Sequence, residues 1–195
     1  MPNSRSYERV YEEYAYILDF LPFPLPTTSS RLKWRGPIAQ AIGEDYFTLL
    51  ELAPRPGITL NIGERVFIGR GERDKIIKVL RKINFDELTT TAKNELSRII
   101  DTIVTRNEHK FVKFFNEAPP LTTRLHSLEL LRGIGKKLLW EILREREKKP
   151  FENFEDIRAR TRISDPKKAI IERILEELEN NEKYYLFVKW KRSFR

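Results

Sequence analysis

The sequence predicts an α+β fold in which a small N-terminal β-barrel is followed by an all-α domain. Three observations predict it. Short apolar runs separated by turn residues fill the first part of the chain, as in small closed barrels. Apolar residues then recur at helical spacing. A Gly-Ile-Gly turn interrupts that helical pattern at Gly133–Gly135. The predicted organisation is a barrel in residues 1–72, connecting helices in 73–119, paired helical hairpins in 120–182, and a C-terminal strand and basic tail in 183–195.

The charge of the chain favours a polyanionic partner. The 195 residues include 37 Lys and Arg against 29 Asp and Glu, a net charge of +8. Residues 120–195 hold 19 of these cations and 13 of these anions, so this part carries +6 of the excess and also contains the glycine turn. Basic proteins attract nucleic acids through the phosphates. A nucleic-acid ligand is therefore expected to contact the C-terminal part.

The residue types that the chain lacks exclude several classes of function. There is no cysteine, which excludes disulfides, thiol catalysis and cysteine-ligated zinc. His109 and His126 fall on separate predicted helices, so we expect no metal site and no cofactor. The sequence has no run of about 18 apolar residues and no signal-peptide pattern, and we therefore expect a cytoplasmic protein without membrane contact.

The strands of the barrel are predicted from β-branched and aromatic residues between turn signals. Residues 7–20 predict one or two strands, and a proline-containing loop follows them. A β-hairpin is predicted from Ile38 to Leu52 around the turn Gly43–Asp45. Ile62–Ile68 predicts a Gly-containing turn leading into a strand, and this phrase resembles OB-like or SH3-like barrels.

The loop before that hairpin combines one tryptophan with three cations. An exposed tryptophan offers a surface on which a base can stack, and neighbouring cations hold the phosphates of a single strand. The alternative is that Trp34 covers the end of the barrel and the cations are ordinary surface. The candidate nucleic-acid contacts of this loop are Arg31, Lys33, Trp34 and Arg35.

Connecting helices are predicted from Asp74 onward, where the period of the apolar residues changes. Residues 76–83 have a short apolar face, and Leu96–Val104 form a stripe at i, i+3, i+4 spacing. Phe111–Phe115 predict a further helix that ends before Pro119. Such stripes are typical of helices that pack on a core, and these helices are expected to join the barrel to the basic part.

A helix-hairpin-helix is predicted around the glycine turn, with helices over Leu125–Arg132 and from Lys136 to about Lys149. The glycines remove Cβ atoms that would keep another backbone away, and glycine tolerates a positive φ. The backbone amides at the start of the second helix attract an anion such as a phosphate. A structural hairpin with a glycine turn is the alternative. The candidate nucleic-acid contacts are Arg132, Gly133, Ile134, Gly135, Lys136 and Lys137.

A second, weaker copy of this hairpin follows after 29 residues, at Phe154–Leu175. It has no glycine turn, and a carboxylate stands where an anion would bind. Asp165 is a good N-cap and Pro166 suits the first helical position. We interpret this copy mainly as the packing partner of the first, with side contacts to phosphate from Ser164, Lys167 and Lys168.

The C-terminal segment from Lys183 is strand-like and then basic. It is expected to return to the barrel as a last strand. The alternative is a frayed cationic end that makes only non-specific contacts.

Residues 125–178 resemble the tandem helix-hairpin-helix domains of DNA repair, recombination and DNA-uptake proteins and of some RNA-associated factors. In that family the Gly-hydrophobic-Gly hairpin binds the sugar-phosphate backbone whatever its sequence, which implies this role for Gly133–Lys137. The second hairpin departs from the family pattern at Arg162 and Ser164. The departure puts a symmetric grip on both strands of a duplex in doubt.

The whole chain also resembles an archaeal family, the domain-of-unknown-function family numbered 655. Its members are described as predicted RNA- or nucleotide-binding proteins. Their genes often neighbour those of an rRNA dimethyladenosine methyltransferase and a small RNA-polymerase subunit. The resemblance implies a setting in ribosome assembly or translation, with ribosomal or RNA-polymerase components as partners. It supplies no catalytic residue.

The sequence thus predicts a non-catalytic, sequence-tolerant nucleic-acid-binding protein, with RNA favoured over DNA by the barrel and the family resemblance. Two alternatives stay open, a protein-interaction scaffold and a nucleic-acid processing enzyme. An enzyme needs grouped carboxylates or a poised lysine or aspartate. The carboxylates here occur as adjacent pairs that fit an ordinary surface: Glu12-Glu13, Glu44-Asp45, Glu155-Asp156 and Glu176-Glu177.

Overall fold

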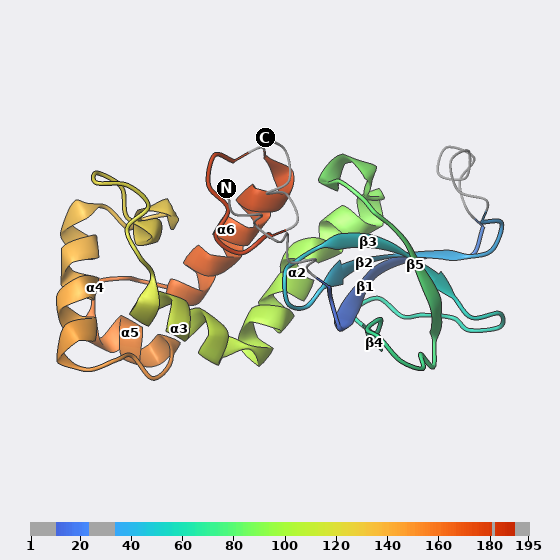
Figure 1. Ribbon diagram of the computed structural model, residues 1–195, viewed down its shortest axis with the longest axis horizontal. Coiled ribbons are helices and arrows are strands. Elements are labelled where there is room, and N and C mark those ends of the chain that lie inside the picture. Colours follow the sequence, from blue (N-terminus) through green and yellow to red (C-terminus); the bar gives the residue numbers. More distant parts are fainter. Residues whose placement is uncertain (1–10, 24–33, 181, 190–195) are drawn as a thin grey trace, which may run out of the picture. The chain divides into compact units, whose positions relative to one another are not determined.

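The computed structural model describes residues 11–23, 34–180 and 182–189, and it has a mixed α+β fold (Figure 1). The chain forms two compact units. One contains residues up to Glu95 together with the chain from Phe187, and the other contains Leu96–Leu186. The first unit holds the β-sheet, and the second holds most of the helices. None of the described helices is both long enough and apolar enough to span a bilayer.

The sheet is a curled, five-stranded antiparallel half-barrel with strand order β4-β1-β2-β3-β5 (Figure 1). The hairpin predicted around Gly43–Asp45 is confirmed, because Ala39 pairs with Leu52 and Ile42 with Leu49. A bulge between Ile17 and Asp19 interrupts the pairing of β1 with β2. The strands are β1 (Tyr14–Leu21), β2 (Ile38–Gly43), β3 (Leu49–Pro54), β4 (Arg65–Phe67) and β5 (Ile76–Lys82).

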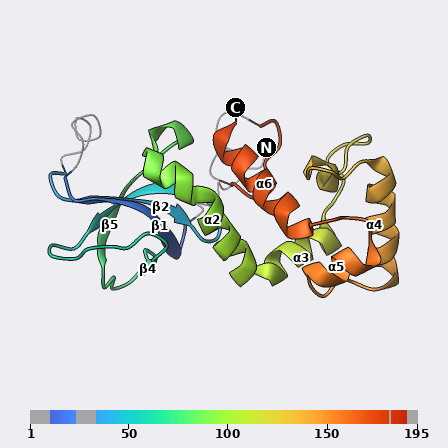
Figure 2. The same cartoon turned by 180° about the vertical axis from the view of Figure 1, so that it is seen from behind.

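Both faces of the central strands are covered, and every residue of β2 and β3 is buried. Ala39 and Ala41 point to the main apolar cluster of the sheet. Gln40 points to the opposite face, where its side-chain oxygen accepts a hydrogen bond from the amide of Thr89 (2.8 Å) and its nitrogen donates to the carbonyl of Glu87 (2.9 Å). The segment that leads into α2 therefore covers this face (Figure 2).

The helix predicted over residues 76–83 is wrong, because this segment is the edge strand β5. It pairs with β3, so that Leu52 lies opposite Val79 and Glu51 opposite Arg81. The buried carboxylate of Glu51 accepts two hydrogen bonds from the Arg81 guanidinium (2.8 and 3.1 Å). A short run of Ile, Val and Leu fits both the helical and the strand period, and pairing with β3 makes this segment a strand.

The helical part of the chain agrees with the predicted apolar stripes of α2 and α3, and α3 ends before Pro119. The helix predicted over Leu125–Arg132 is reduced to one 3₁₀ turn, η2, because Leu131 is already extended. The helical elements are η1 (Phe85–Glu87), α2 (Thr90–Arg106), α3 (Glu108–Glu117), η2 (Ser127–Leu130), α4 (Lys136–Lys148), α5 (Phe154–Arg160) and α6 (Pro166–Glu179).

The last described segment, residues 182–189, contains no strand, so the strand predicted from Lys183 is wrong within this range. Its polar backbone groups find side-chain partners instead. The amide of Leu186 donates to the buried carboxylate of Glu177 (2.6 Å), and Arg173 donates to the carbonyl of Tyr184. The basic residues from 190 onward lie outside the described part of the chain.

Candidate functional site

The segment that leads to the glycine turn is held by a capping box at His126. The Nδ1 of His126 accepts a hydrogen bond from the amide of Leu128 (3.1 Å), and the carboxylate of Glu129 accepts one from the amide of His126 (2.8 Å). The Ser127 hydroxyl donates to the carbonyl of Pro119. Burial lowers the pKa of His126, and the positive charge of Arg146 adds to the effect. The imidazole is therefore held in the neutral form that can accept the hydrogen bond.

The turn itself places one apolar side chain inward and leaves both glycines open. Ile134 is only 4% exposed, and its amide donates to the carbonyl of Leu131 (3.1 Å). Gly133 has a φ of +85°, which favours glycine. Gly135 has an extended backbone that any residue adopts. A Cβ added at either glycine would meet no atom within 4 Å, so the outer side of the turn is accessible.

Helix α4 begins at this turn without a side-chain cap. Gly135 is its N-cap, and its first turn contains no acidic residue. The first amides of a helix have no acceptor within the helix, and they carry the positive end of the helix dipole. The other two hairpin helices differ, because Asn153 caps α5 and Asp165 caps α6 through their side chains. Among these three helices, only α4 begins without a side-chain cap.

The two lysines that follow the turn have different surroundings. The Nζ of Lys136 donates to the carbonyl of Arg124 (2.8 Å) and lies 2.8 Å from the carboxylate of Glu129. The hydrogen bond from Lys136 is the main cause that lowers the pKa of Glu129. Lys137 is exposed, and its ammonium has no ion-pair partner among the described residues. Arg132 is also exposed beside the turn. Lys137 is therefore the more available of the two lysines.

The candidate residues of the second hairpin are spread over different contacts. Ser164 is exposed, and the next residue, Asp165, accepts a hydrogen bond from the amide of Lys168 (2.8 Å). The Nζ of Lys167 lies 2.6 Å from Asp101 on α2, which uses its charge within the protein. The Nζ of Lys168 lies 3.9 Å from Glu172 on α6. A carboxylate therefore occupies the start of α6.

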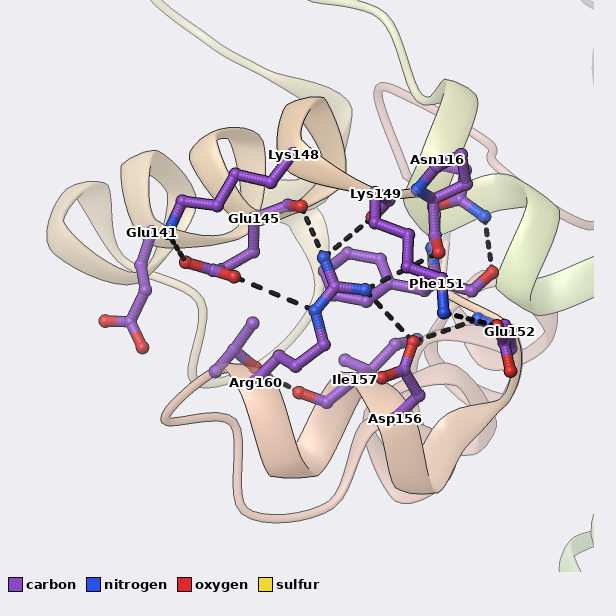
Figure 3. A network of polar contacts seen from close by, with 12 residues as sticks. Asn116, Glu141, Glu145, Lys148, Lys149, Phe151, Glu152, Asp156, Ile157 and Arg160 are labelled. Carbon is purple, nitrogen blue, oxygen red and sulfur yellow. Dashed lines mark hydrogen bonds and ion pairs between the residues drawn. The ribbon is translucent and has the colours of Figure 1, made fainter.

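A polar network joins the end of α4 to α5 (Figure 3). The Arg160 guanidinium donates to the carbonyls of Lys149 (2.7 Å) and Glu145, forms an ion pair with Asp156 (3.1 Å), and lies over the ring of Phe151. These contacts cap the C-terminal end of α4, where carbonyls lack helical partners. Arg160 is thus a structural residue that holds the C-terminal end of α4, the helix that begins at the glycine turn.

The loop candidate Trp34 is half-buried rather than exposed. Its Nε1 donates to the carbonyl of Pro37 (3.0 Å), and a Cβ added at Gly36 would lie 2.9 Å from the ring. The Nζ of Lys78 lies 5.2 Å from the ring centroid. Part of the stacking surface is therefore used within the protein. Arg35 is exposed, whereas Arg31 and Lys33 lie outside the described residues. Base stacking on Trp34 stays a prediction.

Trp140 is not among the contacts predicted from the sequence, yet it is 62% exposed. It lies in an open pocket of about 430 Å³ on the surface of α4, whose other lining residues are Lys137, Arg144 and Arg162. The signal was present in the sequence. Lys137, Trp140 and Arg144 are spaced i, i+3, i+7, which places them on one face of a helix. On this helix, the contacts predicted from the sequence end at Lys137 and do not include the rest of that face.

The carboxylates do not gather around this turn or pocket. Glu141 lies next to Trp140 in sequence, and its carboxylate accepts hydrogen bonds from the amide and the Nε of Arg162 (2.8 and 2.7 Å). Within residues 11–23, 34–180 and 182–189, no group of three or more His, Asp or Glu side chains is arranged to hold a metal ion.

Relatives of this chain occur in two archaea. The sequence model of the family described as "Protein of unknown function (DUF655)" matches residues 11–189. An uncharacterised protein of Methanocaldococcus jannaschii is 47% identical over 185 residues, which cover 94% of this chain and 82% of that protein. A crystal structure of a DUF655 protein from Archaeoglobus fulgidus has a TM-score of 0.80 and 46% identity, over 91% of this chain and 99% of that one. The similarity extends over both compact units.

Proposed function

This chain belongs to the DUF655 family, and we propose that it is a non-catalytic nucleic-acid-binding protein with RNA as the favoured ligand. In this proposal the half-barrel is of the OB-like or SH3-like kind, and residues 120–182 form tandem helix-hairpin-helix motifs. The turn Gly133–Gly135 and the first turn of α4 hold a backbone phosphate whatever the base sequence. Partners among ribosomal or RNA-polymerase components and a cytoplasmic location, without membrane contact, belong to the same proposal.

The observation that carries the proposal is the open start of α4. A hairpin that served packing alone would need Gly133 for its positive φ but would have no need of glycine at position 135, where the backbone is extended. A Ser, Thr, Asp or Asn there would cap the helix better than or as well as glycine. The start of α4 instead has no side-chain cap, and no atom lies within 4 Å of either absent Cβ. Uncovered amides at a helix start are a ready-made phosphate site.

The surrounding charges support the same site. Lys137 supplies an exposed ammonium on the first turn of α4. Lys136 is held near the turn by Glu129 and the carbonyl of Arg124, which orders its side chain. The carboxylate of Glu129 also offsets the positive charge that Lys136 offers to a phosphate. We therefore assign the main electrostatic contact to Lys137 and a secondary one to Lys136. Arg132 contributes from the other side of the turn.

The second hairpin has a supporting role in this proposal. The Arg162 guanidinium lies 2.6 Å from Glu141, which ties the loop before α6 to the helix α4 that bears the phosphate site. The carboxylate of Asp165 already accepts a hydrogen bond from the amide of Lys168 at the start of α6. Phosphate contacts by Ser164, Lys167 and Lys168 are therefore proposed only from the side. A one-sided grip suits a single strand or one strand of a duplex.

A protein-interaction scaffold is the second candidate, and the pairing of Lys136 with Glu129 favours it, because that ion pair lowers the charge offered to phosphate. A pull-down from the native cells with and without nuclease separates the two. Partners that persist after digestion support the scaffold. Partners that disappear with the nucleic acid support the first proposal.

The direct test uses two substitutions at Gly135, both of which supply an N-cap side chain. Gly135→Ser adds a neutral cap, and Gly135→Asp adds a carboxylate where the phosphate is proposed to bind. Since a Cβ at this position meets no atom within 4 Å, the free energy of unfolding of both variants should lie within about 0.5 kcal/mol of the wild-type value. Binding of labelled RNA and DNA of several sequences is measured by fluorescence anisotropy. We expect at least a tenfold loss of affinity for Gly135→Asp and a much smaller loss for Gly135→Ser. Equal affinities of the two variants would refute the phosphate site.

A further inference from the structure

We propose that the pocket around Trp140 binds an unpaired nucleobase, next to the phosphate that the proposed function places at the start of α4. This inference rests on that proposed function and names its ligand class more closely, as a single strand or an unpaired end or loop. The pocket is lined by Lys137, Trp140, Arg144 and Arg162.

The chemistry of the lining points to a flat, anionic ligand. Trp140 exposes 62% of its surface, although nearly all the other large apolar side chains of α4 to α6 are at least half-buried. An exposed indole in the lining of a pocket offers a π-face to any base, which makes stacking tolerant of sequence. Three cations surround it, and two of them, Lys137 and Arg144, lie one turn before and one turn after Trp140. Such an arrangement combines a stacking surface with phosphate contacts.

The size of the pocket suits one nucleotide. Its volume of about 430 Å³ is within the range of small-molecule sites, and it is largely open to solvent. The carboxylate of Glu141 accepts hydrogen bonds from the amide and the guanidinium of Arg162. That contact also fixes the loop that carries Arg162. Arg162 is thus paired, and Lys137 and Arg144 supply positive charge to the lining beside Trp140.

The pocket is continuous with the proposed phosphate site through Lys137. This residue belongs to the first turn of α4 and also lines the pocket. Trp140 follows Gly135 by five residues, or about 7.5 Å along a helix axis. A base attached to a phosphate at Gly135, or to the next phosphate, can reach the indole. Bases of an intact duplex show only their edges to a protein, so a stacking contact with the indole requires an unpaired base.

The test compares Trp140→Ala with Trp140→Phe, which keeps an aromatic ring. Position 140 is largely exposed, so both substitutions are expected to leave the fold unchanged. Circular dichroism checks this. Affinities for a single-stranded RNA and for a duplex of the same sequence are measured by anisotropy. We expect Trp140→Ala to weaken single-strand binding about tenfold or more. Trp140→Phe should lose much less, and duplex binding should change by less than about twofold.

The outcomes separate this inference from the proposed function. If Gly135→Asp abolishes binding while Trp140→Ala leaves single-strand affinity unchanged, the pocket is not a base site and the phosphate site stands. If Trp140→Ala weakens the single strand and the duplex equally, the pocket contacts the backbone and the inference fails. If Trp140→Ala instead abolishes capture of a protein partner from nuclease-treated extract while RNA binding stays intact, the pocket binds that protein and the inference fails. A wild-type chain that binds no nucleic acid overturns both proposals.

Discussion

The carboxylate of Glu12 is a structural element of the sheet unit. It accepts hydrogen bonds from the amides of Asp45 (2.8 Å), Tyr46 (3.1 Å) and Thr48 (3.1 Å), which form the loop between β2 and β3. Burial raises the pKa of Glu12, although these hydrogen bonds act in the opposite direction. A Cβ at Gly43 would lie 2.0 Å from the Glu12 side chain, so only glycine leaves room for this contact. One buried side chain thus orders the whole loop.

Replacing Glu12 should therefore destabilise the protein far more than replacing its neighbour. Glu12→Ala leaves three loop amides without their acceptor, and we expect a loss of about 2–4 kcal/mol in the free energy of unfolding. Glu13→Ala removes an exposed side chain and should cost less than about 0.5 kcal/mol. Urea unfolding followed by circular dichroism measures both, and similar losses would contradict the role given to Glu12.

The prediction that the paired carboxylates fit an ordinary surface is wrong for Glu12, and also for Glu44 and Glu177, because all three are buried. Adjacent residues point in different directions, but the sequence does not say which of the two meets the loop. That choice depends on pairing with a hairpin more than 30 residues away. The same limit explains the two tryptophans. Trp34 is partly covered by Pro37 and Lys78, and Trp140 is left open, because of contacts that no local pattern contains.

The buried imidazole of His126 makes the helical unit sensitive to acid. Its pKa is lowered in the folded state, so the unfolded chain binds the proton more tightly. Stability from this group is fully present above the unfolded pKa of about 6.5 and is lost as the pH falls through the lower folded pKa. An NMR titration of His109→Gln, which leaves one histidine, should give a pKa for His126 below 6.5. A value at or above 6.5 would contradict the capping role of Nδ1.

Among the elements, the turn before α4 shows two glycines with different reasons to be there. Gly133 adopts a φ of +85°, and Gly135 has an extended backbone with φ of −88°. Both face open space. The backbone favours glycine at position 133, whereas the extended backbone at position 135 accepts any residue, and in the proposed function glycine there leaves the amides accessible.

This difference predicts unequal effects of the same substitution on folding. Gly133→Ala forces an L-residue into the left-handed region and should cost about 1–2 kcal/mol of unfolding free energy. Gly135→Ala keeps its backbone conformation but places a poorer N-cap residue at the start of α4, and it should cost less, about 0.5–1 kcal/mol. Urea unfolding of the two variants checks this. A larger loss at position 135 than at 133 would show that Gly135 is there for folding and not for access.

Helices were easier to predict than strands and turns, for a physical reason. α2, α4 and α6 are long enough for their apolar stripes to repeat over several turns, so the period is clear. β5 has too few residues for its period to be decided, and its pairing with β3 makes it a strand. η2 is short because the His126 capping box and the extended Leu131 bound it closely on both sides.

Across the whole molecule, binding to nucleic acid is expected to depend on salt, because a net charge of +8 releases counterions from phosphates. The position of a charge should nevertheless matter more than the total. Lys137→Glu and Lys113→Glu change the net charge equally, but Lys113 lies on α3 and is 3.8 Å from Glu117. We expect Lys137→Glu to weaken RNA binding about tenfold and to reduce the salt slope by about 1. Equal effects of the two variants would indicate attraction by bulk charge alone.

In the proposed function, main-chain amides at the start of α4 donate hydrogen bonds to a phosphate. An NMR titration of ¹⁵N-labelled protein with a short single-stranded RNA, in which the amide signals and their exchange with solvent are followed, tests this most directly. The amides of Gly135, Lys136 and Lys137 should show the largest shifts and exchange more slowly in the complex. Shifts confined to side chains or to the sheet unit, with these amides unchanged, would contradict the claim.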